Sequence, residues 1–71
     1  MSMLKMIEVL AESDKSWEDA AQNAVTTAGK SVRGIKSIYL DNIEAAVEDG
    51  KIAKYRVNGK ISFLLEGQDA G

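Results

Sequence analysis

Apolar residues recur at helical spacing in the second quarter of the chain. They follow intervals of three and four residues, the period of one helix face, and comprise Trp17, Ala20, Ala21, Ala24, Val25, Ala28 and Val32. Ser16 stands before them as an N-cap, with the carboxylate of Asp19 three residues later, which is close to a capping box. Gly34 follows the last apolar position, as is typical of a helix C-terminus. The pattern predicts one amphipathic helix from about Trp17 to Arg33.

Alternating apolar and polar residues predict three strands around this helix. The first covers residues 3–11, and the second covers residues 36–47, where the apolar positions change phase near Asp41 and Asn42, as is typical of a β-bulge. In the last strand one face carries Tyr55, Val57, Gly59, Ile61, Phe63 and Leu65, and the other carries Lys54, Arg56, Asn58, Lys60 and Ser62. The first of these two faces is predicted to form the core.

The last two strands are predicted to form a hairpin. Asp49 and Gly50 stand between them, and both residue types tolerate the positive φ angles of a two-residue turn. The order β-α-β-β indicates an α+β fold in a single domain, residues 1–71. The first strand could join either the edge of this hairpin or its centre. Gly59 on the core face leaves room for a helix alanine or a bulky neighbour to approach closely.

The chain has more apolar surface than one helix can cover. In the first strand Ile7 and Val9 lie on one side, while Leu4, Met6 and Leu10 lie on the other. A chain of 71 residues has little core, and with no Cys and no His it lacks a disulfide or a usual zinc site as a staple. We therefore expect the chain to complete its fold by packing against copies of itself.

Composition narrows the range of functions. Nine Lys and Arg against eleven Asp and Glu give a net charge of −2, which does not favour nucleic acid as a partner. Without His or Cys there is no imidazole base and no thiolate nucleophile, so we expect no enzyme activity. Lys5 and Glu8 interrupt the apolar start and no stretch suits a membrane span, so the expected location is the cytoplasm. A basic group is formed by Lys30, Arg33 and Lys36. We expect it to interact favourably with the helix dipole at the C-terminal end of the helix.

A few polar and aromatic residues are candidates for binding. Asp41 and Glu44 belong to an acidic group that lacks the spacing of a calcium-binding loop, but copies of one carboxylate can meet at a symmetry axis and hold a cation. Trp17 is expected to pack the start of the helix on the sheet, or else to contact a neighbouring subunit or a ligand. Tyr39 falls on the side of its strand opposite Ile38 and is a candidate for an interface or ligand contact.

The order and spacing of several short motifs resemble the dodecin family over nearly the whole chain. These motifs are Lys5-x-Ile7-Glu8-Val9, Ser16-Trp17-Glu18-Asp19-Ala20, Lys30-Ser31-Val32-Arg33, Tyr55-Arg56-Val57 and Ile61-Ser62-Phe63. The resemblance implies a β-α-β-β subunit whose three-stranded antiparallel sheet partly wraps one helix, with twelve copies forming a hollow homododecamer. It also implies a non-enzymatic protein that binds and stores a flavin, riboflavin or FMN, as stacked pairs.

Two positions depart from the flavin-binding members of the family. Flavin-binding dodecins stack the flavin ring on a Trp where this chain has Ser37. They hydrogen-bond the pyrimidine edge of the ring with a Gln where this chain has Arg56. A hydroxyl has no aromatic face to stack on, so flavin binding is expected to be weakened, whereas Arg56 could pair with a phosphate or a carboxylate. Ser37, Arg56 and the adjoining Tyr39 are the candidate flavin-site residues. One branch of the family that lacks the Trp is associated with calcium, which leaves calcium as the alternative ligand, with Asp41 and Glu44 as its candidates.

Overall fold

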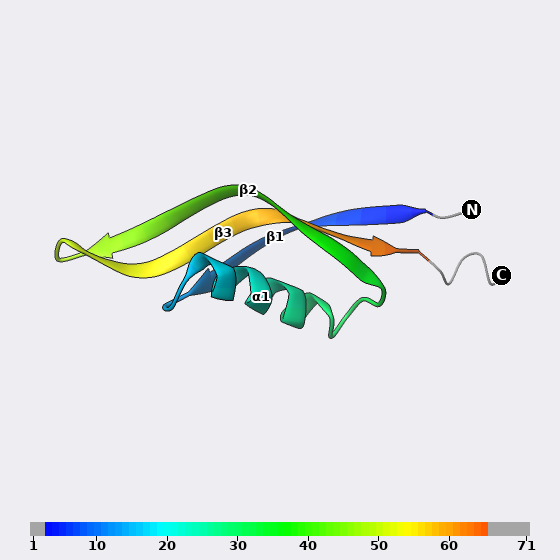
Figure 1. The fold of residues 1–71 in the computed structure, drawn as a ribbon, viewed down its shortest axis with the longest axis horizontal. Helices are drawn as coiled ribbons and strands as arrows, with labels where there is room; N and C mark the ends of the chain where they lie inside the picture. Colours follow the sequence, from blue (N-terminus) through cyan, green and yellow to red (C-terminus); the bar gives the residue numbers. More distant parts are fainter. Residues whose placement is uncertain (1–2, 66–71) are drawn as a thin grey trace.

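A computed structural model describes residues 3–65 of the chain (Figure 1). The elements are β1 (Leu4–Ser13), α1 (Trp17–Ala28), β2 (Ile35–Glu48) and β3 (Lys51–Leu64). The strands form one antiparallel sheet in the order β1-β3-β2. The predicted α+β fold is thus confirmed, and the first strand lies at a sheet edge beside β3.

The core lies between α1 and one face of the sheet, which we call the inner face; the opposite face is the outer face. Val57 and Ile61 of the central strand are fully buried on the inner face. Ala20 and Ala24 of α1 are buried against this face, and these small side chains let the helix approach the strands closely. The alternation predicted for the last strand is therefore confirmed.

The hairpin and the bulge follow the sequence prediction. Asp49 and Gly50 have φ angles of 54° and 76°, which a two-residue turn between right-twisted strands requires. The register between β2 and β3 shifts between Leu40 and Asn42, where the apolar positions change phase. The bulge lets β2 bend while its apolar side chains stay on the inner face.

Gly59 is close to a different neighbour from the one predicted. A Cβ atom at this position would lie 2.1 Å from the carbonyl oxygen of Tyr39. The neighbour is therefore the backbone of β2, not a helix alanine or a bulky side chain. The contact lies beside the bulge, where β2 bends across the central strand.

The helix is shorter than predicted. It ends at Ala28, and Gly29 caps it with its N–H directed at the carbonyls of Thr27 and Val25. The chain then continues in tight turns, in which the N–H of Lys30 and that of Ser31 each bond a carbonyl three residues earlier. These turns keep the apolar period going beyond the helix, which explains the predicted end at Arg33.

The basic group and Gly34 lie beyond the C-terminus of the helix. Lys30 and Arg33 lie beyond the end of α1, and the last helical turn contains no basic residue. Gly34, expected just after the helix, instead has a φ of 70° and turns the chain into β2. The favourable interaction of this basic group with the helix dipole stays a prediction.

The hairpin extends well past the helix. Twelve helical residues span about 18 Å, whereas a strand of fourteen residues spans about 46 Å. In Figure 1 the β2–β3 turn projects beyond both α1 and β1. The large apolar side chains left exposed include Leu4, Met6, Leu10, Tyr39, Leu40, Ile43, Val47 and Ile52. No helix in residues 3–65 is long and apolar enough to cross a membrane.

Candidate functional site

A small network of polar groups lies at the N-terminus of α1. The Ser16 hydroxyl accepts a hydrogen bond from the Asp19 N–H at 2.9 Å, which confirms the predicted N-cap. The Asp19 carboxylate accepts from the hydroxyl of Ser13 at 2.6 Å, and Ser13 also accepts from the N–H of Lys15. Ser13 is buried at the end of β1, so this network fixes the point at which the strand gives way to the helix.

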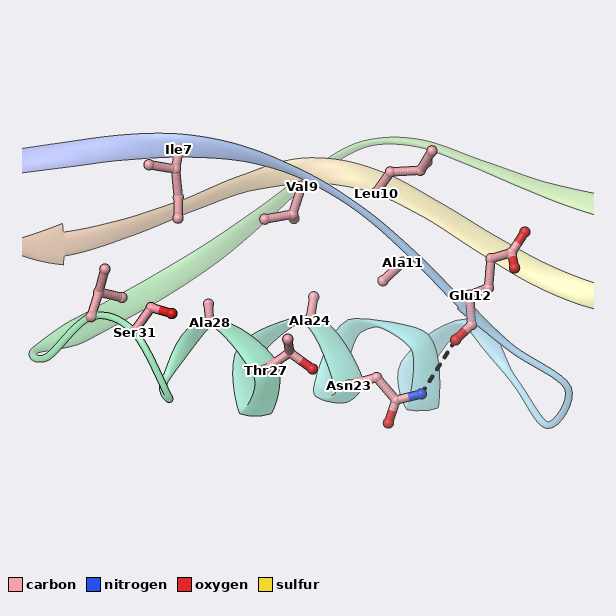
Figure 2. A pocket seen from close by; sticks show the side chains of 11 residues that line it. Ile7, Val9, Leu10, Ala11, Glu12, Asn23, Ala24, Thr27, Ala28 and Ser31 are labelled. Carbon is pink, nitrogen blue, oxygen red and sulfur yellow. Dashed lines mark hydrogen bonds between the residues drawn. The ribbon is translucent and has the colours of Figure 1, made fainter.

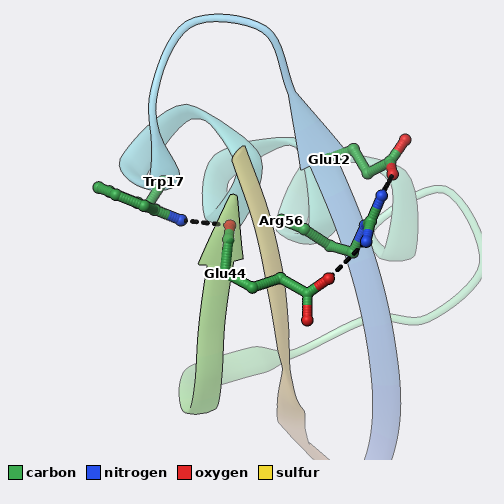
Figure 3. Close-up of polar contacts among 4 residues, drawn as sticks. All are labelled: Glu12, Trp17, Glu44 and Arg56. Carbon is green, nitrogen blue, oxygen red and sulfur yellow. Dashed lines mark hydrogen bonds and ion pairs between the residues drawn. The ribbon is translucent and has the colours of Figure 1, made fainter. Parts of the chain in front are cut away.

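Trp17 joins the first turn of the helix to the sheet (Figure 3). Its indole N–H donates to the carbonyl of Glu44 at 2.9 Å. Its ring meets that of Tyr55 edge to face, with 4.8 Å between the ring centres. These contacts agree with the first of the two predicted roles, packing of the helix start on the sheet.

On the outer face, Arg56 of the central strand lies between two glutamates. Its guanidinium donates to the Glu12 carboxylate on β1, with N···O distances of 2.7 and 2.8 Å, and to the Glu44 carboxylate on β2. Both glutamates stand directly opposite Arg56 in the register. The hydrogen bonds to Glu12 and then to Glu44 raise the pKa of Arg56 above its ordinary value. One ionic row thus crosses all three strands.

A second charged row crosses the outer face at Lys60. The ammonium group of Lys60 lies 2.7 Å from the Asp41 carboxylate, and this hydrogen bond is the main reason why the pKa of Lys60 is raised. Glu8 stands opposite Lys60 on β1 and adds to the same effect. Between the two rows, the Asn58 amide donates to the Glu8 carboxylate and to the carbonyl of Val9.

The two predicted metal candidates therefore lie on the same face, each beside a basic residue. Asp41 binds Lys60 and Glu44 binds Arg56. Nowhere in residues 3–65 do three His, Cys, Asp or Glu side chains gather as a metal-binding group. Within one chain, Asp41 and Glu44 act as partners of cationic side chains.

The candidate flavin-site residues also face outward, but they do not all meet. The Ser37 hydroxyl shares a hydrogen bond of 2.6 Å with that of Ser62, and Tyr39 stands beside Lys60 with 60% of its surface exposed. Ser62 and Arg56 are six residues apart along β3, a distance of about 20 Å. Within the chain, Ser37 and Tyr39 thus lie close together and Arg56 lies at a separate place.

Two grooves flank the helix on the inner side, away from these residues. The groove between β1 and α1 has a volume of about 580 Å³, and Ile7 and Val9 point across it toward Ala24 and Ala28 (Figure 2). The groove between α1 and β2 has a volume of about 490 Å³. Their walls are largely apolar, and none of the five candidate residues lines either groove.

Sequence reasoning missed Glu8 and Glu12 as members of the outer-face rows. Their spacing places them on one side of a strand, but the side chains they meet depend on how β1 pairs with β3. The tight turn sets the register of β2 on β3, whereas no short turn sets that of β1. The identity of the ion pairs therefore required the structure.

Comparison with known proteins finds several dodecins. The Dodecin family pattern matches residues 3–66. The calcium dodecin of Mycobacterium tuberculosis is 35% identical over 65 residues, which are 92% of each chain. A structure of that calcium dodecin, described as having a calcium-binding site, aligns with a TM-score of 0.77 and 34% identity, covering 87% of this chain and 89% of the other. The dodecin of Streptomyces coelicolor aligns with a TM-score of 0.86 and 29% identity over 92% of this chain and 93% of the other.

Proposed function

Because the chain belongs to the dodecin family, we propose that it assembles from twelve identical copies into a hollow shell that binds and stores calcium ions. Dodecins are non-enzymatic binding proteins, and the lack of His and Cys agrees with such a role. The long hairpin supports self-assembly, since it projects beyond the helix and leaves apolar side chains such as Val47 and Ile52 exposed. Copies of the chain would bury these side chains.

We prefer calcium to flavin as the ligand because of Ser37 and its hydrogen bond. This residue stands where flavin-binding dodecins have the stacking Trp, and its hydroxyl is hydrogen-bonded to Ser62. A hydroxyl pair offers a flavin no aromatic face, and loss of stacking removes about 0.5–1.5 kcal/mol beyond the loss of buried area. The similarity to a calcium dodecin points the same way.

Calcium would have to be shared between copies of the chain. The ion takes six to eight oxygen ligands, whereas each chain offers Asp41 and Glu44 on separate rows of the outer face. Symmetry brings equivalent carboxylates together wherever such a row approaches an axis. Of these two candidates we propose that Asp41 contributes to the site, released from Lys60 where copies meet, whereas Glu44 stays paired with Arg56.

Flavin is the second candidate ligand, and the exposure of Tyr39 favours it. The Tyr39 ring is well exposed on the outer face, two residues from Ser37 along β2. An exposed ring of this kind could stack on an isoalloxazine. Binding would be weaker than on a Trp because the smaller ring buries less area.

Thermal unfolding of the assembled protein tests the choice between the ligands. A ligand that binds only the folded state raises the melting temperature by mass action. We expect millimolar calcium to raise it relative to a chelator, with magnesium at the same concentration as the control, and micromolar riboflavin to leave it unchanged. No shift with calcium, together with quenching of riboflavin fluorescence at micromolar protein, would replace calcium with flavin.

A further inference from the structure

Arg56 directs each of its three guanidinium nitrogens at a carboxylate of the same chain. The guanidinium directs Nε and Nη2 at the same Glu12 carboxylate and Nη1 at that of Glu44 (Figure 3). An anionic ligand at Arg56 would have to compete with these charge-assisted hydrogen bonds. All three guanidinium nitrogens already bind carboxylates of the same chain.

The two glutamates are held in place from the other side of the sheet. The helix residue Asn23 donates to the carbonyl of Glu12 at 3.3 Å (Figure 2), and Trp17 donates to that of Glu44 at 2.9 Å. Helix side chains on the inner face thus fix the backbone of both residues whose carboxylates bind Arg56 on the outer face. The backbone of both glutamates would therefore stay in place if the guanidinium were removed.

The charge balance of this row depends on one residue. Two carboxylates and one guanidinium leave a net charge of −1, whereas the same row without the guanidinium would carry −2. Two carboxylates that face each other across one strand are oxygen ligands of the kind that calcium prefers. The position between them is already filled by a cation that cannot lose its proton.

We infer that Arg56 is a specificity-determining residue, a built-in counter-ion that keeps a divalent cation from binding between Glu12 and Glu44. The inference rests on the proposed calcium-binding function, because it says that calcium does not bind at the row formed by Glu12, Arg56 and Glu44. It adds that Arg56 is not the preferred partner of a flavin phosphate, because each of its three nitrogens already binds Glu12 or Glu44. Of the two candidate acids, Asp41 is then the more accessible to calcium, since its partner Lys60 is a single point charge.

The test is the number of calcium ions bound per chain, measured by equilibrium dialysis on the assembled protein. Arg56→Gln is expected to bind about one calcium ion more per chain than the wild type at millimolar calcium. Arg33→Gln, which also removes one arginine, is the matched control and should bind as the wild type does. Adding Glu12→Gln to Arg56→Gln should abolish the gain. An assembled Arg56→Gln protein without additional calcium would overturn the inference.

Glu12→Gln alone keeps the proposal testable if Arg56→Gln does not fold. In the wild type this row should hold no calcium, so Glu12→Gln is expected to leave the bound calcium unchanged. Loss of bound calcium in this variant would contradict the inference. A wild type that binds no calcium, beside an Arg56→Gln variant that does, would reject the proposed function and leave the role of Arg56 intact.

Discussion

At the scale of single residues, Gly59 determines how closely β2 can bend across the central strand. Its missing side chain leaves the space that the Tyr39 carbonyl occupies, and no rotation of a side chain can make room, because both groups are backbone. Only glycine therefore fits this position. The bulge beside it sets the path of β2 across the inner face.

Gly59→Ala is expected to reduce the free energy of unfolding by about 3 kcal/mol, the upper range for an overpacked core. Gly50→Ala is the matched control, because the turn has open space around Gly50 and only the positive φ angle opposes alanine. Its expected cost is about 1 kcal/mol. Urea unfolding measures both. Equal costs would show that the contact with Tyr39 does not matter.

The Lys60–Asp41 pair is expected to contribute to stability up to high pH. The folded-state pKa of Lys60 is raised above its ordinary value of 10.5, so the contribution is full below that value and is lost as the pH rises through the folded pKa. The difference in melting temperature between the wild type and Lys60→Gln should therefore be constant from about pH 7 to 10 and shrink above 10.5. A Lys60 effect that shrinks already at neutral pH would contradict the assignment.

At the scale of elements, the junction between β1 and α1 depends on a buried hydroxyl. Ser13→Ala would leave the Asp19 carboxylate without its donor and the Lys15 N–H without its acceptor. We expect a loss of about 2 kcal/mol in the free energy of unfolding, as for unsatisfied groups near the interior. Ser31→Ala, in the exposed turns after the helix, is the control and should cost less than about 0.5 kcal/mol. A comparable loss in both variants would argue against the network.

The elements themselves were predictable where local chemistry decides them. Asp49-Gly50 permits only a tight turn, and the phase change at Asp41 and Asn42 requires a bulge. The end of the helix was not predictable, because the tight turns after Gly29 carry Val32 in nearly the same period. A periodic pattern does not distinguish an α-helix from successive tight turns.

The candidate site was predictable by residue type but not by partner. Asp41, Glu44 and Arg56 were singled out from the sequence, whereas Glu12 was missed because the pairing of β1 with β3 is a long-range contact. The separation of Arg56 from Ser37 also follows only from the register. Sequence periodicity assigns a residue to a face, and the neighbours on that face come from the strand order.

At the scale of the whole molecule, the exposed hairpin predicts how the proposed shell is held together. Val47 is 62% exposed in the single chain and lies near the β2–β3 turn. Val47→Lys should leave the secondary structure unchanged and convert the assembly into smaller species, because a charge would enter an apolar contact. Glu48→Lys, the adjacent exposed position on the opposite side of the strand, is the control. Light scattering after gel filtration gives the masses, and an intact Val47→Lys assembly would contradict the proposed role of the hairpin.

Native mass spectrometry of the purified protein tests the central claim most directly, since it reports assembly and ligand together. Twelve copies of the 7.7 kDa chain predict a species of about 92 kDa. We expect this species to carry calcium ions that a chelator removes, and no flavin. A species of 7.7 kDa, or an assembly that retains flavin and takes up no calcium, would contradict the account.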